Sequence, residues 1–168
     1  FKSDVSCFGG TDGFINLTVT GGTPAYSFLW SQGATTQNVS GLSPGIYAVT
    51  VTDSRGCTSY PDATIIQPPT LNTSYTKIDV TCFGGNNGSL NLTVTGGTPP
   101  YSYSWSNGAT TQDISGLVAA TYNVTVTDNE GCQKFNTIVI TQPAQVTTST
   151  TKVDVSCFGG NNGSINLT

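Results

Sequence analysis

The chain has 168 residues, of which only 8% are charged, and its net charge is −4. The five basic residues are scattered along the chain, which excludes the clustered positive charge of a nucleic-acid-binding protein. There is no His and no run of about 18 apolar residues that could cross a bilayer. A charge-poor chain with 20 glycines and many threonines favours strands with polar faces and tight turns over helices.

The sequence repeats itself with a period of about 75 residues, which is long enough for one small structural unit. Residues 7–81 return as residues 82–156 without insertion or deletion, more than half of the aligned positions are identical, and the pattern begins again at Cys157. A fixed period of this kind indicates a tandem array. Both ends of the sequence fall inside a unit, so we expect an excerpt of a longer mature protein.

Short segments of each repeat alternate apolar and polar residues with the period of two that predicts a half-buried strand. They are residues 15–19, 26–30 and 47–51 in the first repeat and residues 90–94, 101–105 and 122–126 in the second. Turn sequences rich in Gly, Asn and Pro separate them, and a further strand is expected over residues 135–141, ending before Pro143.

About seven short strands per repeat, with aromatic residues on the apolar faces and a cysteine pair, predict an all-β fold. We expect tandem immunoglobulin-like antiparallel β-sandwich repeats, with two packed sheets in each. The expected units are residues 1–69, residues 70–144, and residues 145–168 as the N-terminal fragment of a third repeat. The predicted core residues are Trp30, Tyr47, Trp105 and Tyr122.

The repeat accounts for the odd number of cysteines. One disulfide within each repeat is expected, Cys7 with Cys57 and Cys82 with Cys132, which leaves Cys157 without a partner in the sequence. Closing a loop of this length stabilises a fold by about 4 kcal/mol through loop-closure entropy. A Cys57–Cys82 bond would instead tie successive repeats together, and free buried thiols are the other alternative. Zinc is disfavoured, because there is no His and no paired cysteine cluster.

The residues Gly96–Gly108, followed by Tyr122–Asp128 and by Gly131 and Cys132, resemble the SprB repeat of very large surface adhesins. The resemblance covers both full repeats and the fragment. It implies an extracellular, cell-surface protein of the Bacteroidetes group, exported by type IX secretion; the best known member of the family is an adhesin that moves along the cell during gliding. A looser similarity to PKD-type domains implies the same immunoglobulin-like sandwich.

No residues form a plausible catalytic site. Without His there is no Ser/His or Cys/His pair, so no enzyme activity, catalytic residue or cofactor is predicted. The Gly-Gly pairs are not phosphate loops, since no helix follows them. Asp53 and Asp128 lie in turns without the dense acidic ladder of a calcium loop, so hydrogen-bond capping of those turns is favoured over calcium binding.

Two functional hypotheses remain. In the favoured one, the array is a semi-rigid stalk or filament that carries an adhesive tip, and the links over residues 68–75 and 143–150 are extended because of their Pro, Thr and Val residues. In the alternative, each repeat binds surface polysaccharide, although aromatic stripes such as Tyr26, Phe28 and Trp30 are better explained as core. The expected partners are neighbouring repeats, with surface polysaccharide or other filament chains as further candidates, and neither nucleic acid nor a membrane span.

Overall fold

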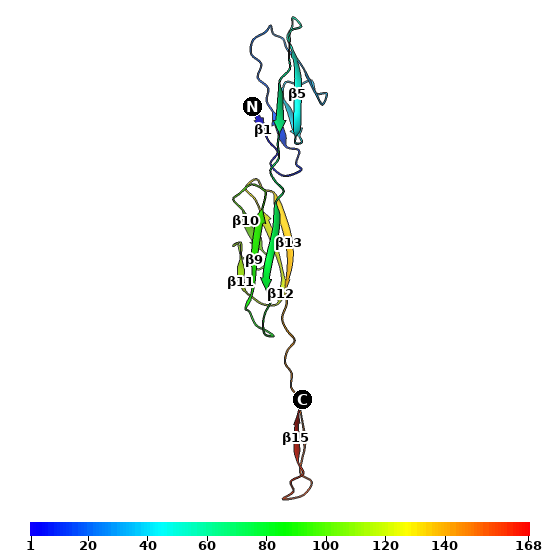
Figure 1. Ribbon diagram of the computed structural model, residues 1–168, viewed down its shortest axis with the longest axis vertical. Helices are drawn as coiled ribbons and strands as arrows, with labels where there is room; N and C mark the ends of the chain where they lie inside the picture. Colours follow the sequence, from blue (N-terminus) through cyan, green and yellow to red (C-terminus); the bar gives the residue numbers. More distant parts are fainter.

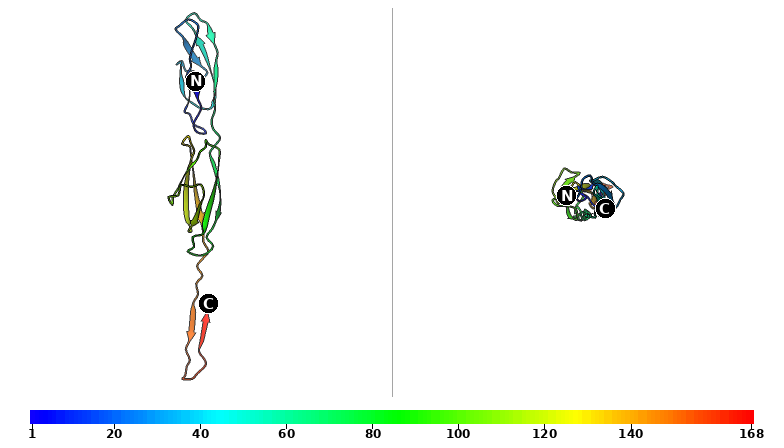
Figure 2. Two further views of the ribbon diagram at one scale, coloured as in Figure 1. Left: turned by 90° about the vertical axis from the view of Figure 1, so that its left-hand side faces the viewer. Right: turned by 90° about the horizontal axis from the view of Figure 1, so that it is seen from above.

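The computed structural model describes all 168 residues as strands and connecting loops. Two elongated bodies and a terminal hairpin follow one another end to end (Figure 1). Seen along the long axis they overlie one another, so the array is narrow (Figure 2). None of the chain's segments forms a helix with the length and apolarity that a membrane span requires.

The second repeat is a complete six-stranded sandwich. One antiparallel sheet has the order β8-β9-β11 and the other the order β10-β12-β13. The strands are β8 (Asn72–Ile78), β9 (Gly88–Thr95), β10 (Ser102–Trp105), β11 (Ile114–Leu117), β12 (Ala120–Thr127) and β13 (Gln133–Ile140). Two antiparallel sheets with these connections form an immunoglobulin-like sandwich. The predicted fold class is confirmed, with six strands in this repeat where about seven were expected.

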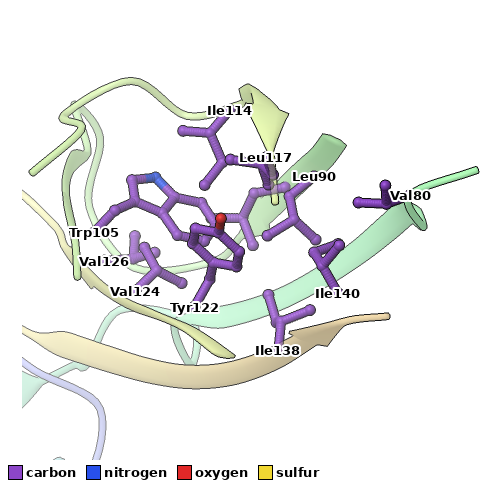
Figure 3. Close-up of a cluster of buried hydrophobic side chains, with 11 residues drawn as sticks. Val80, Leu90, Trp105, Ile114, Leu117, Tyr122, Val124, Val126, Ile138 and Ile140 are labelled. Carbon is purple, nitrogen blue, oxygen red and sulfur yellow. The ribbon is translucent and has the colours of Figure 1, made fainter. Parts of the chain in front are cut away.

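Eleven buried apolar side chains, from both sheets and from Val80 in the loop after β8, form the core of the second repeat (Figure 3). Val124 and Val126 alternate along β12 with half-buried threonines, so the period-two pattern gives the inner face correctly. Trp105 lies across the core and its indole Nε1 donates to Thr111 O at 2.9 Å. Tyr122 is buried beside it, with its hydroxyl donating to Val118 O at 3.2 Å.

The first repeat follows the same plan, with its first two strands shorter and its last strand divided into two. Its strands are β1 (Lys2–Ser3), β2 (Gly13–Ile15), β3 (Ser27–Trp30), β4 (Val39–Leu42), β5 (Gly45–Thr52), β6 (Thr58–Ser59) and β7 (Asp62–Ile65). Both β6 and β7 pair with β5. They are separated at Tyr60 and Pro61, where the proline cannot donate to the ladder. Eight buried residues including Trp30 make its core, and Tyr47 packs against them partly buried.

The third segment is a single hairpin. Strands β14 (Thr150–Val153) and β15 (Ser164–Leu167) pair antiparallel, and every residue in them is exposed. A lone hairpin has no second sheet against which to bury its apolar face.

Candidate functional site at the junction between repeats

The disulfide in the structure joins the two repeats. Cys7 of the first repeat is bonded to Cys132 of the second, with a Cα–Cα distance of 5.7 Å. Cys57 and Cys82, which were expected to pair with Cys7 and Cys132, are exposed free thiols, as is Cys157. The expectation of one bond within each repeat is therefore wrong for this structure.

Strand direction explains why the bond within a repeat does not form. Cys7 precedes β2, next to the end of β7, whereas Cys57 lies in the turn after β5. The length of β5, about 23 Å, separates the two cysteines, which lie at opposite ends of the sandwich. Cysteines whose Cα atoms are more than about 7 Å apart cannot be bridged without moving the backbone.

Asp128 fixes the loop that presents Cys132 to the first repeat. Its Oδ1 accepts the backbone N–H of Glu130 at 3.0 Å and of Cys132 at 2.9 Å, and its Oδ2 accepts the N–H of Thr98 at 2.9 Å. The buried carboxylate thus joins two neighbouring turns and holds Cys132 at the end of the sandwich. A carboxylate saturated by backbone donors is typical of a turn cap, which is the role expected for it.

The loop that carries Cys7 is equally constrained. Gly10 N–H donates to Cys7 O at 2.9 Å, and Gly9 N–H donates to the side-chain Oε1 of Gln67 at 2.8 Å. Asp12 accepts from the backbone N–H and hydroxyl of Ser6, and these bonds hold the pKa of Asp12 below its usual value. Cys7 is thereby positioned beside the exit of the chain from the first repeat.

The link between the sandwiches is bonded to the second repeat. Gly97 N–H donates to Pro69 O at 2.8 Å, and Leu71 is only 7% exposed. Gly96 has φ of +71° and lies against the link: a Cβ built on it would be 2.0 Å from Thr70 O. The link therefore packs directly against the backbone of the Gly96-Gly97 pair, which we call the seat of the link. Only residues without a side chain allow the two backbones to approach this closely.

Strand β8 begins at Asn72, so the free link is shorter than expected. The extended segment was predicted to continue to Tyr75, but residues 72–75 pair with β9. Cys7, Pro68, Leu71, Gly97 and Cys132 are among the residues that line a crevice of about 320 Å³ at the junction. A short link, a disulfide and a seat of two glycines thus join the bodies.

An ion pair stabilises the end of each sandwich from which the chain continues into the following link. In the second repeat, Asp79 accepts the N–H of Thr141 at 2.8 Å and the Nζ of Lys77 at 2.9 Å, and these bonds lower the pKa of Asp79. Lys77 also donates to Val139 O at 2.7 Å. Asp4, Lys2 and Ile66 repeat this arrangement in the first repeat, where the Lys2 ammonium and then the Ile66 N–H lower the pKa of Asp4.

The remaining predicted residues lie away from this junction. Asp53 caps its turn as Asp128 does, accepting from Thr23, Arg55 and Cys57, each at 2.9 Å. The N–H groups of Thr23 and then Cys57 are the main causes of its lowered pKa. Tyr26 and Phe28 are partly buried against the core that contains Trp30, so this stripe faces inward.

Several residues of the junction carry roles that sequence reasoning missed. Gln67, the Gly96-Gly97 seat and the Lys2/Asp4 pair were not singled out as functional. The signal available was their recurrence: Gln142, the Gly21-Gly22 pair and Lys77/Asp79 stand at the equivalent places. Recurrence alone does not separate a residue that joins repeats from one that builds each repeat.

Comparison with known proteins agrees with the repeat pattern. The SprB repeat family matches residues 1–35, 74–110 and 149–168, which together are more than half of the chain. The chain belongs to the SprB repeat family. It is accordingly a repeat segment of a cell-surface adhesin, in agreement with the resemblance of its sequence.

A solved structure similar to this chain is the amphioxus IgVJ-C2 molecule, with a TM-score of 0.37 and 14% sequence identity. The match covers 79% of this chain and 97% of that one. A search of curated proteins found no match.

Proposed function

We propose that this segment is a semi-rigid stalk of an extracellular surface adhesin, which holds an adhesive region away from the cell during adhesion and gliding. Its structural units are the first repeat, residues 1–69, the second repeat, residues 70–144, and residues 145–168, which form the N-terminal part of a third repeat. The observation that carries the proposal is the junction, where the Cys7–Cys132 disulfide and the seated link connect the same two sandwiches. A second covalent connection beside the link opposes bending and twisting more strongly than a single flexible link does.

Force along such a stalk passes through the disulfide as well as through the link. Cys132 lies directly before β13, which leads to the exit of the second repeat at Gln142. A pull transmitted from Cys7 to Cys132 therefore reaches the next link without stretching the segment between them. This arrangement suits a long surface protein that is dragged along a substrate.

Small-angle scattering on arrays of two, four and eight repeats tests the stalk. Under oxidising conditions we expect the radius of gyration to rise nearly in proportion to the number of repeats. Growth as about the square root of that number, which is the behaviour of freely jointed units, would contradict the proposal. A matched array with Cys7→Ser and its equivalents is expected to bend more at each junction.

A polysaccharide-binding role for each repeat is the competing hypothesis, and it rests on no particular feature of the junction. Because Trp30 and Trp105 are buried, a sugar site would have to use exposed loops rather than the aromatic stripes. A glycan array probed with the two-repeat chain distinguishes the hypotheses, since a stalk gives no saturable binding.

A further inference from the structure

The two free cysteines of the complete repeats are the equivalents of the two that are bonded. Cys82 occupies the position of Cys7 in the repeat, and Cys57 occupies the position of Cys132. The bond Cys7–Cys132 joins the first cysteine of one repeat to the second cysteine of the next. The same rule assigns Cys82 a partner in a following repeat and Cys57 a partner in a preceding one.

The loop that carries Cys82 has the conformation of the bonded Cys7 loop. Gly85 N–H donates to Cys82 O at 3.0 Å, and Gly84 N–H donates to Gln142 Oε1 at 2.8 Å, as Gly10 and Gly9 do in the first repeat. Asn87 takes the place of Asp12 and accepts the N–H of Thr81 at 3.2 Å. Cys82 is thus held beside Gln142, where the chain leaves the second repeat toward the third segment.

The loop that carries Cys57 matches the bonded Cys132 loop in the same way. Asp53 accepts the N–H of Cys57 at 2.9 Å and that of Thr23 at 2.9 Å, the contacts that Asp128 makes to Cys132 and Thr98. Gly21 also keeps the positive φ of its equivalent, 76° against 71° for Gly96. Both halves of the junction therefore keep their shape at the two cysteines that are not bonded.

We propose that Cys57 and Cys82 are disulfide sites for further copies of this repeat. Cys82 bonds the Cys132 equivalent of the following repeat, and Cys57 bonds the Cys7 equivalent of the preceding one. In each case two thiols lose two protons and two electrons as the S–S bond forms, and a disulfide-bearing oxidant is reduced to two thiols. Every junction of the array then has one disulfide beside its backbone link.

This pattern creates two interleaved covalent paths along the array. One runs through Cys7–Cys132, along the backbone from Cys132 to Cys157, and then through the next disulfide; the other runs from Cys57 to Cys82 in the same manner. Each path advances two repeats for about 25 residues of backbone, which stretch to about 85 Å at most. The segment between the two cysteines of a repeat is bypassed, so tension falls on the link and on the strands that flank it, such as β13 and β14, and not on the strands between the two cysteines.

The test extends the chain by a copy of residues 94–144 after Thr168, which completes the third repeat. The extended chain is refolded in a mixture of reduced and oxidised glutathione, and its free thiols are then alkylated. Its disulfide-linked peptides are identified by peptide mapping without reduction. We expect linked peptides for Cys7–Cys132 and for Cys82 with the copied Cys132, and two alkylated thiols, at Cys57 and Cys157. A free Cys82 together with a free copied Cys132, or a bond from Cys82 to Cys57, would overturn the proposal.

Matched variants and a mechanical measurement exclude a chance pairing. Cys82→Ser is expected to free the copied Cys132, whereas Cys57→Ser should leave both linked peptides unchanged. In longer arrays pulled by their ends, each added pair of repeats should lengthen the fully stretched oxidised chain about six-fold less than the reduced chain, because about 25 residues rather than about 150 residues are extended. Equal increments with and without reductant would overturn the proposal even where a disulfide is mapped.

Discussion

Residues 68–71 and 143–146 occupy the same place in the repeat, yet their surroundings differ. Leu71 is 7% exposed and its neighbours are bonded to the second sandwich, whereas Val146 is 89% exposed. Both segments begin with proline, and both contain a threonine or valine that favours extended backbone. Local stiffness is therefore not what distinguishes them.

The difference is the body that follows each link. After residues 68–71 comes a closed sandwich with the Gly96-Gly97 seat and Cys132, while residues 143–146 precede an isolated hairpin. A link is thus held in a fixed conformation by contacts with the repeat that follows it. The links were predicted to be extended because of their Pro, Thr and Val residues, but it is tertiary contact that fixes the first link.

Destroying the second sandwich should make the first link resemble the second. Trp105→Ala removes a buried indole from the core and is expected to destabilise this repeat by about 3 to 5 kcal/mol. Hydrogen exchange should then show protection lost at Gly97, whose N–H donates to Pro69 O in the link, together with the amides of the second repeat's strands. Thr125→Ala, at a half-buried position of β12, should cost far less, and the reverse order would mean that the aromatic face is not the interior.

Substitution of Gly96 tests the contact between the link and the second repeat, and a matched variant accounts for backbone strain. Gly96→Ala forces a Cβ against Thr70 O, so we expect a loss of about 2 to 3 kcal/mol in the free energy of unfolding of the second repeat. Gly21→Ala is the matched control, because Gly21 has a similar positive φ and nothing within 4 Å of its built Cβ. Equal losses for the two variants would show that the link contributes no contact at Gly96.

Truncating the linking side chains compares the two links directly. Leu71→Ala truncates a buried side chain at the junction and is expected to cost about 2 kcal/mol, the low end for a buried leucine. Val146→Ala changes an exposed residue and should leave the thermal midpoint unchanged within error. A midpoint that falls equally in both variants would contradict the ordering of the first link by the second sandwich.

The smallest expected effect concerns the turn that carries Cys57. Backbone N–H groups lower the pKa of Asp53 in the folded state, so its contribution is present above the unfolded value of about 4 and is lost as pH falls through the lowered folded value. Asp53→Asn should therefore flatten the decline of the thermal midpoint below about pH 4. An unchanged slope between about pH 5 and pH 2 would show that these hydrogen bonds do not favour the carboxylate.

The sandwich was predictable because alternating residues such as Val124 and Val126 define its inner face without knowledge of the partner strand. The topology of an immunoglobulin-like sandwich also decides which cysteines can pair. In such a sandwich the strand after Cys7 and the strand before Cys57 run in the same direction, which places these cysteines at opposite ends. Loop length and the independence of each repeat, on which the expected pairing rests, say nothing of strand direction.

The seat of the link was beyond sequence reasoning for a different reason. Gly96 has the positive φ of an ordinary turn glycine, and its close approach to Thr70 depends on how the link folds back against the turn between β9 and β10. Pro61, in contrast, marks the interruption between β6 and β7 in the sequence itself. A strand break at a proline can be predicted from the local sequence, whereas contacts at the junction can be seen only in the three-dimensional structure.

Peptide mapping of the oxidised chain without reduction tests the covalent junction most directly. The structure predicts one linked pair of peptides, containing Cys7 and Cys132, and alkylated thiols at Cys57, Cys82 and Cys157. A Cys7–Cys57 or Cys82–Cys132 linkage would place the bonds inside the repeats and contradict a stalk joined by disulfides at its junctions.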